Sequence, residues 1–121
     1  MNQQQYRLLC MDIDGTLLNS AHKLPLANRE AVQSAAKNGV TICLMSARPP
    51  RAVFSIRDAL GVDGPLVCCG GGLILSGKNR LADSRLTRAC AQAVLQETQA
   101  RGIHLSVYRD LDWLIAAEDE W

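Results

Sequence analysis

The stretch LLCMDIDGTL, residues 8–17, decides the fold of this chain. Its first four residues are apolar and do not alternate with polar ones, which is typical of a strand buried on both faces of a parallel sheet. Two carboxylates, Asp12 and Asp14, follow at once, and Gly15 then permits a tight turn. Because open parallel sheets bind ligands at the carboxyl ends of their strands, the sequence predicts a functional site here.

Two helical patterns, each stopping at a glycine, and two more apolar runs continue the chain. In order they are residues 26–38 (helix), 40–45 (strand), 52–60 (helix) and 66–69 (strand). Strand, helix, strand, helix, strand is the order of a doubly wound α/β domain. We therefore predict the α/β fold class, with a Rossmann-like parallel sheet core.

The pattern changes after the three glycines at residues 70–72. A hairpin, a helix and two further strands are predicted, at residues 73–75 with 80–82, 87–101, 103–108 and 113–117. Antiparallel strands around a helix do not continue a βαβ core, so we place a domain boundary near Asp83. The prediction is a core portion over residues 1–83 and the start of a second α/β unit over residues 84–121.

Composition excludes several classes of function. Lysine and arginine number 13 against 12 aspartate and glutamate residues, whereas a nucleic-acid or membrane-surface binder would carry a basic excess. The apolar runs are too short to span a bilayer, and residues 1–5 are too polar for the core of a signal peptide. We expect neither nucleic acid nor a membrane as a partner.

The five cysteines are odd in number and include no Cys-x-x-Cys pair. Four of them lie inside apolar runs, where a free thiol behaves as a small hydrophobe. We interpret them as core residues rather than as disulfides or metal ligands. Reduced thiols fit a cytoplasmic protein.

Three predicted strands end in polar or flexible residues: residues 12–17, 46–49 and 70–72. The first of these, Asp-x-Asp-Gly-Thr-Leu, resembles the first motif of the haloacid dehalogenase superfamily. Ser46-Ala47-Arg48-Pro49 is similar to the second motif, which reads Thr-Gly-Arg in the Cof-type subgroup. The remaining residues resemble that subgroup's third strand and the start of its α/β cap domain, so the resemblance covers nearly the whole chain.

The resemblance implies a magnesium-dependent phosphatase that acts on small phosphorylated metabolites. Asp12 would attack phosphorus and form an aspartyl-phosphate, and Asp14 would protonate the leaving oxygen and later activate water. The dehalogenases of the superfamily lack this second carboxylate, so Asp14 indicates phosphate chemistry. Thr16 and Ser46 can donate hydrogen bonds to phosphate. The resemblance also implies Mg²⁺ held by the Asp12 carboxylate and the Ile13 backbone carbonyl.

Several of these features also have purely structural interpretations. Asp12 and Asp14 could be solvated carboxylates of an Asp-Gly turn, and Ser46 could be an ordinary helix cap. The glycines at 70–72 lack the spacing of a phosphate-cradling loop, which favours a plain tight turn.

Other polar residues receive no role from the sequence. Arg48 is expected on the surface or on the substrate side, with no function that we can assign. His22 and His104 are far apart in sequence and without paired ligands, so both are interpreted as incidental.

Two motifs that the family needs are not found in residues 1–121: a lysine that holds the nucleophile and phosphate, and an acidic loop that completes the magnesium site. We therefore expect the chain to be a fragment or a truncated product. In the complete fold the first strand is central, so here residues 8–11 should form an exposed edge through which the chain self-associates.

Two alternatives to the phosphatase remain. One is a catalytically incomplete fragment that acts at most as a binding or interaction module. The other is a receiver-like signalling domain, which also carries acidic residues at strand ends. A hairpin and a cap-like segment after the third strand disfavour the receiver.

Overall fold

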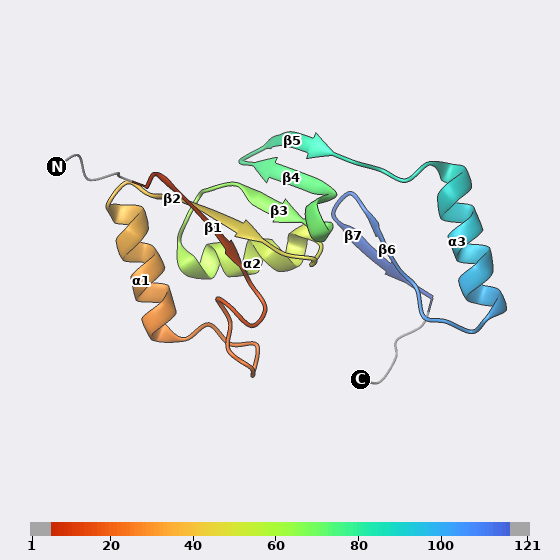
Figure 1. The fold of residues 1–121 in the computed structure, drawn as a ribbon, viewed down its shortest axis with the longest axis horizontal. Coiled ribbons are helices and arrows are strands. Elements are labelled where there is room, and N and C mark those ends of the chain that lie inside the picture. The colour runs from red at the N-terminus through yellow and green to blue at the C-terminus, as the bar shows by residue number, and fades with distance from the viewer. Residues whose placement is uncertain (1–5, 117–121) are drawn as a thin grey trace. The chain divides into compact units, whose positions relative to one another are not determined.

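The computed structural model of the protein describes residues 6–116. The chain divides into two compact units, one ending at Asp83 and one beginning at Ser84 (Figure 1). No helix within the described range has the length and apolar character that crossing a membrane requires.

The first unit contains a five-stranded mixed sheet with the strands in chain order. Its strands are β1 (Leu8–Asp12), β2 (Thr41–Met45), β3 (Leu66–Cys68), β4 (Leu73–Ser76) and β5 (Asn79–Asp83). The first three are parallel, whereas β4 and β5 pair antiparallel to their neighbours. This mixed sheet confirms the predicted α/β fold class, and β4 with β5 confirms the predicted hairpin.

Two helices cross between the parallel strands, α1 (Leu26–Lys37) and α2 (Pro50–Leu60). They contact each other, and they contact β2 and β3 respectively. Their apolar residues, such as Val32, Val53 and Leu60, join Leu44 of β2 in one buried cluster. The helix α2 begins two residues before the predicted start because Pro50 occupies its first turn, where proline is tolerated.

The prediction that every apolar run is buried on both faces is correct for the middle of β2 and wrong for β1. Ile42, Cys43 and Leu44 are buried, but Leu8 is 55% exposed and Cys10 is also exposed. The reason is position: β1 lies at the edge of the described sheet, as expected, and pairs only with β2. The expectation that Cys10 is a core residue therefore also fails.

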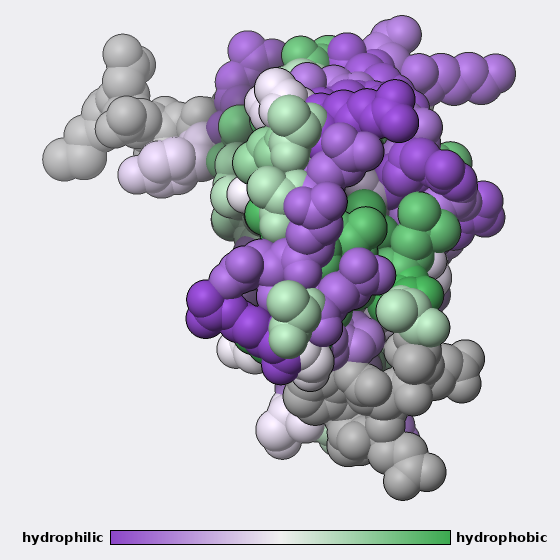
Figure 2. Space-filling model, turned by 90° about the vertical axis from the view of Figure 1, so that its right-hand side faces the viewer, coloured by the Kyte–Doolittle hydropathy of each residue, from purple (hydrophilic) through white to green (hydrophobic). Residues whose placement is uncertain are grey.

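The second unit consists of α3 (Arg88–Ala100) and a hairpin of β6 (Ser106–Arg109) and β7 (Asp112–Ile115). The side chain of Thr87 caps α3 by accepting a hydrogen bond from the Cys90 amide at 3.2 Å. No residue of α3 is buried, and Trp113 is 58% exposed. Figure 2 shows hydrophobic and hydrophilic residues interspersed on the face that it turns to the viewer. The last residue of the second predicted strand, residue 117, lies outside the described range.

Candidate active site

The loop after β1 is anchored by apolar side chains and exposes its polar ones. Ile13 and Leu17 are 0% and 1% exposed, whereas Asp12 and Asp14 are exposed. Gly15 has a φ of 76°, a left-handed value that confirms the predicted need for glycine in this turn. Burying Ile13 between two acids turns both carboxylates toward solvent at the end of the strand.

The Ile13 carbonyl oxygen accepts two backbone hydrogen bonds, from Leu17 N at 3.1 Å and from Leu18 N at 2.9 Å. A carbonyl oxygen has two lone pairs, and both are engaged here. Both bonds help to close the loop, and Leu17 N also lies 3.3 Å from the Asp12 carbonyl oxygen. The role of the Ile13 carbonyl as a magnesium ligand stays a prediction.

The Asp12 carboxylate has no ion-pair or side-chain hydrogen-bond partner in the part of the chain that the structure describes. Asp12 is the last residue of β1, and its backbone lies in register with Met45 of β2. Its carboxylate is therefore available as a nucleophile or as an oxygen ligand for a hard cation. Residues 6–116 contain no cluster of three acidic, histidine or cysteine side chains that could hold a metal ion. Asp12 thus fits a magnesium site only as one ligand among others.

Asp14 is held by an arginine from the next strand's loop. Arg48 Nε donates to Asp14 Oδ2 at 2.8 Å, and Arg48 Nη2 donates to Oδ1 at 2.6 Å. His22 Nδ1 lies 3.4 Å from the same Oδ1. The hydrogen bonds from Arg48, with a smaller contribution from His22, hold the pKa of the Asp14 carboxyl below its ordinary value. The partnership likewise raises the pKa of Arg48.

Ser46 and Arg48 lie in the loop that joins β2 to α2. Ser46 is 8% exposed, and its Oγ accepts a hydrogen bond from the Arg48 backbone N–H at 3.1 Å. Pro49 is the N-cap of α2, and no side chain caps that helix. The interpretation of Ser46 as a helix cap is therefore wrong: its hydroxyl braces the loop instead.

The glycine-rich loop after β3 is bonded to the same β2 loop. Gly70 N donates to Ser46 O at 3.1 Å, and Cys69 N donates to Arg48 O at 3.0 Å. Cys69, Gly70 and Gly71 all have positive φ, at 54°, 63° and 98°. Three consecutive left-handed residues make a tight turn, the interpretation that the sequence favoured.

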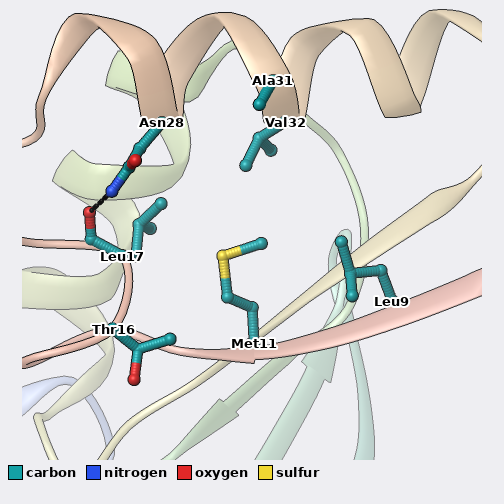
Figure 3. A pocket seen from close by; sticks show the side chains of 7 residues that line it. All are labelled: Leu9, Met11, Thr16, Leu17, Asn28, Ala31 and Val32. Atoms are coloured by element: carbon teal, nitrogen blue, oxygen red, sulfur yellow. Dashed lines mark hydrogen bonds between the residues drawn. The ribbon is translucent and has the colours of Figure 1, made fainter.

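Thr16 is exposed and also borders a hollow between β1 and α1 of about 290 Å³. In Figure 3 its hydroxyl points away from α1, while the hollow is lined mostly by apolar side chains. The polar group of Asn28, also at this hollow, is used by a 2.9 Å bond to the Leu17 carbonyl. The hollow is therefore distinct from the acidic edge at which the predicted catalytic carboxylates stand.

Sequence reasoning placed Arg48 on the surface or substrate side without a role and treated His22 as incidental, so it missed the contacts that both make with Asp14. Arg48 follows Ser46 by two residues at a strand end, which is the signal that could have placed it beside Asp14. His22 carried no such signal, because its approach to Asp14 depends on the path of the 19–23 turn. That turn closes with Asn19 N donating to Lys23 O at 2.9 Å. His104 lies in the second unit, 3.3 Å from the Ser106 hydroxyl.

Comparison with known proteins identifies the family. A family model described as haloacid dehalogenase-like hydrolase matches residues 9–121. The chain belongs to the haloacid dehalogenase-like hydrolases, which confirms the resemblance of the motifs and rejects the receiver-like alternative.

Curated relatives with phosphatase names match this chain. Phosphatase YwpJ of Bacillus subtilis is 33% identical over 75 residues, which cover 62% of this chain and 26% of the relative. The 5-amino-6-(5-phospho-D-ribitylamino)uracil phosphatase YwtE of the same organism is 26% identical over 114 residues, covering 93% and 39%. The chain thus spans well under half the length of these two relatives.

Solved structures share the fold. A protein from Geobacillus kaustophilus superposes with a TM-score of 0.80 at 28% identity, covering 96% of this chain and 45% of the other. A haloacid dehalogenase-like hydrolase from Bacteroides thetaiotaomicron gives a TM-score of 0.86 at 21% identity, covering 96% and 46%. The second likeness supports the fold alone.

Proposed function

We propose that the protein containing this chain is a magnesium-dependent phosphomonoester hydrolase that works through an aspartyl-phosphate on Asp12. The observation that carries the proposal is the contrast between two neighbouring acids. The Asp12 carboxylate is exposed and has no side-chain partner among residues 6–116, whereas the Asp14 carboxylate is held by Arg48. A nucleophile needs a free oxygen, and an acid/base group needs a fixed position.

The reaction would proceed in two steps. An Asp12 oxygen attacks phosphorus, the bond to the leaving oxygen breaks, and Asp14 gives that oxygen a proton. Asp14 then takes a proton from the water that hydrolyses the acyl phosphate. The lowered pKa favours the ionised Asp14 that the second step requires. Each Asp14 oxygen has a further lone pair beside the one that faces Arg48, so one oxygen can carry the proton of the first step while the contact with Arg48 is kept.

Phosphate oxygens would be bound by hydroxyl donors, Thr16 from the β1 loop and Ser46 from the β2 loop. The Ser46 oxygen accepts from the Arg48 amide, which leaves its own hydrogen free to donate. When bound, Mg²⁺ supplies positive charge against the phosphoryl oxygens; the Asp12 carboxylate and the Ile13 backbone carbonyl would be its ligands from the described residues.

The proposed substrates are small phosphorylated metabolites such as sugar phosphates or phosphorylated cofactors. The name of YwtE specifies a phosphorylated ribitylamino-uracil, and another relative, from Escherichia coli, is named a pyridoxal phosphate phosphatase. Assaying a panel of such esters against the whole protein would identify the preferred member. We place the protein in the cytoplasm on the basis of its free cysteines, which suit a reducing compartment.

The test is Asp12→Asn in the protein that contains this chain, assayed with p-nitrophenyl phosphate and Mg²⁺. An amide is a poor nucleophile and a weaker ligand for magnesium, so we expect no measurable turnover. Removal of Mg²⁺ by a chelator should also abolish the wild-type rate. Wild-type turnover by Asp12→Asn would exclude Asp12 as the nucleophile.

A second candidate is that residues 1–121 alone form a binding module without catalysis. It is favoured by the absence of a positive partner for Asp12 among the described residues, since the nearby Arg48 is committed to Asp14. Losing one charge-stabilising group typically costs about a hundredfold or more in rate. Expressed alone, this segment should bind phosphate esters weakly and hydrolyse them very slowly or not at all.

A further inference from the structure

Arg48 forms a bidentate contact with Asp14 that fixes the plane of the carboxylate. Its Nε and Nη2 donate to different oxygens, Oδ2 at 2.8 Å and Oδ1 at 2.6 Å. A two-point contact of this kind restricts rotation of the carboxylate, which a single hydrogen bond does not. Asp14 is 40% exposed and lies on a loop, so without Arg48 its side chain would sample other orientations.

The backbone of Arg48 is itself fixed on both sides. Its N–H donates to Ser46 Oγ at 3.1 Å, and its carbonyl accepts from Cys69 N at 3.0 Å. Pro49 and Pro50 follow, which restricts the conformation of Arg48 and commits the next residues to α2. The Arg48 backbone is therefore fixed by hydrogen bonds within the β2 loop and to the β3 loop, which limits the positions that its guanidinium can reach.

His22 is a weaker partner of the same carboxylate. Its Nδ1 is 3.4 Å from Asp14 Oδ1, and its side chain is 72% exposed. A long, exposed, one-point contact restrains little. The orientation of Asp14 thus depends on Arg48 more than on His22.

We infer that Arg48 is a positioning residue: it sets the orientation of the Asp14 carboxylate toward the reacting phosphate, and Ser46 orients Arg48 in turn. This inference rests on the proposed function, because it assigns Arg48 a part in the reaction of Asp12 and Asp14. It differs from a role in substrate binding, since both contacting nitrogens of Arg48 face Asp14.

The decisive experiment is a double-mutant cycle with Arg48→Gln and Asp14→Asn in the whole protein, with kcat and KM measured separately. Misplacing a catalytic group costs about a hundredfold, and losing a residue that orients one costs about 10–100-fold. We therefore expect Arg48→Gln to lower kcat by about 10–100-fold with KM within about threefold of wild type. Because Arg48 acts through Asp14, the double variant should be no slower than Asp14→Asn alone.

Two further variants separate positioning from structure. Arg48→Lys keeps the charge but not the two-point grip, so its kcat should fall between those of wild type and Arg48→Gln. Arg57→Gln is the matched control: Arg57 Nε and Nη2 also contact one aspartate, Asp58, at 2.9 and 2.7 Å, but on α2 away from the acidic edge. It should leave kcat and KM unchanged. Thermal melts establish whether each variant is folded. If Arg48→Gln is unfolded, Arg48→Lys replaces it in the test.

Three results would overturn the inference. In the first, the rate losses of Arg48→Gln and Asp14→Asn multiply; in the second, Arg48→Gln raises KM while kcat stays at the wild-type value. Wild-type kinetics of Arg48→Gln beside an inactive Asp14→Asn would also remove it and leave the proposed function standing. Wild-type turnover of Asp12→Asn would instead remove the proposed function itself.

Discussion

Gly64, which leads into β3, is a position where the structure predicts a large effect from one added carbon. A β-carbon there would lie 1.7 Å from the Ile42 carbonyl oxygen and 2.7 Å from the Ile42 carbonyl carbon. These are atoms of the neighbouring strand's backbone, which cannot rotate aside as a side chain can. The next residue, Pro65, accepts a hydrogen bond from Leu44 N at 3.1 Å. Gly64→Ala must therefore push β3 away from β2.

The size of the effect follows from known costs of overpacking. Forcing extra atoms into a packed site costs typically about 1–3 kcal/mol, and a clash with backbone belongs at the upper end. Each kcal/mol lowers the melting temperature of a domain of this size by about 4–8 °C, so a cost of about 3 kcal/mol lowers it by about 12–24 °C. Thermal unfolding followed by circular dichroism measures this directly.

Gly39→Ala is the matched control. Gly39 has a φ of +85°, and a β-carbon there meets nothing within 4 Å. The substitution adds left-handed strain of about 1 kcal/mol without a clash, so the melting temperature should fall by about 4–8 °C. If Gly64→Ala lowered the melting temperature no more than Gly39→Ala does, the close approach of Gly64 to the Ile42 carbonyl would be refuted.

Three other outcomes are expected. Residues 1–121 expressed alone should self-associate through the free edge of β1. Leu8→Lys should lower the mass measured by light scattering toward that of the monomer, because an edge lysine opposes strand pairing. An unchanged mass would exclude β1 as the site of self-association. At pH 8, Ellman's reagent should modify the exposed Cys10 quickly and Cys68 only on unfolding. Cys68 is buried, and burial raises its pKa to about 11, so little of its thiol is in the reactive thiolate form. Equal rates of modification would contradict the burial of Cys68. Asp14→Asn should reduce turnover by at least about a hundredfold while phosphate binding, measured by calorimetry, persists; unchanged turnover would exclude the acid/base role.

Local pattern was sufficient to predict the element order of the first unit. Continuous apolar runs gave the parallel strands, and glycines after residues 38 and 60 gave the helix ends, because both signals act over a few neighbouring residues. The start of α2 and the length of β6 were less accurate. The first strand of the second unit begins at Ser106 rather than at residue 103, since residues 103–105 have no paired partner in the described hairpin.

Burial and side-chain pairing depend on residues that are far apart in the sequence, so the sequence predicted them less well. Whether Leu8 and Cys10 are covered depends on which strands flank β1, not on their own hydrophobicity. The contact between Asp14 and Arg48 joins residues 34 apart in sequence. Adjacent parallel strands bring their carboxyl ends together, so nearness was foreseeable, but the two-point grip depends on how Ser46 and Cys69 hold the Arg48 backbone.

The two aspartates of the β1 loop have different surroundings although they lie two residues apart. Alternation along the chain does not separate them, because Asp12 and Asp14 flank the same buried Ile13. The β2 loop makes their environments different. It places the Arg48 guanidinium beside Asp14, and among the described residues it places no charged side chain beside Asp12. Arg48 thereby orients the Asp14 carboxylate and lowers its pKa, whereas the Asp12 carboxylate stays available to bond phosphorus or a cation. Pairs of acids in enzymes divide nucleophilic and proton-transfer work by such differences in environment. The β2 loop, rather than the acidic motif by itself, therefore assigns the roles that we propose for Asp12 and Asp14.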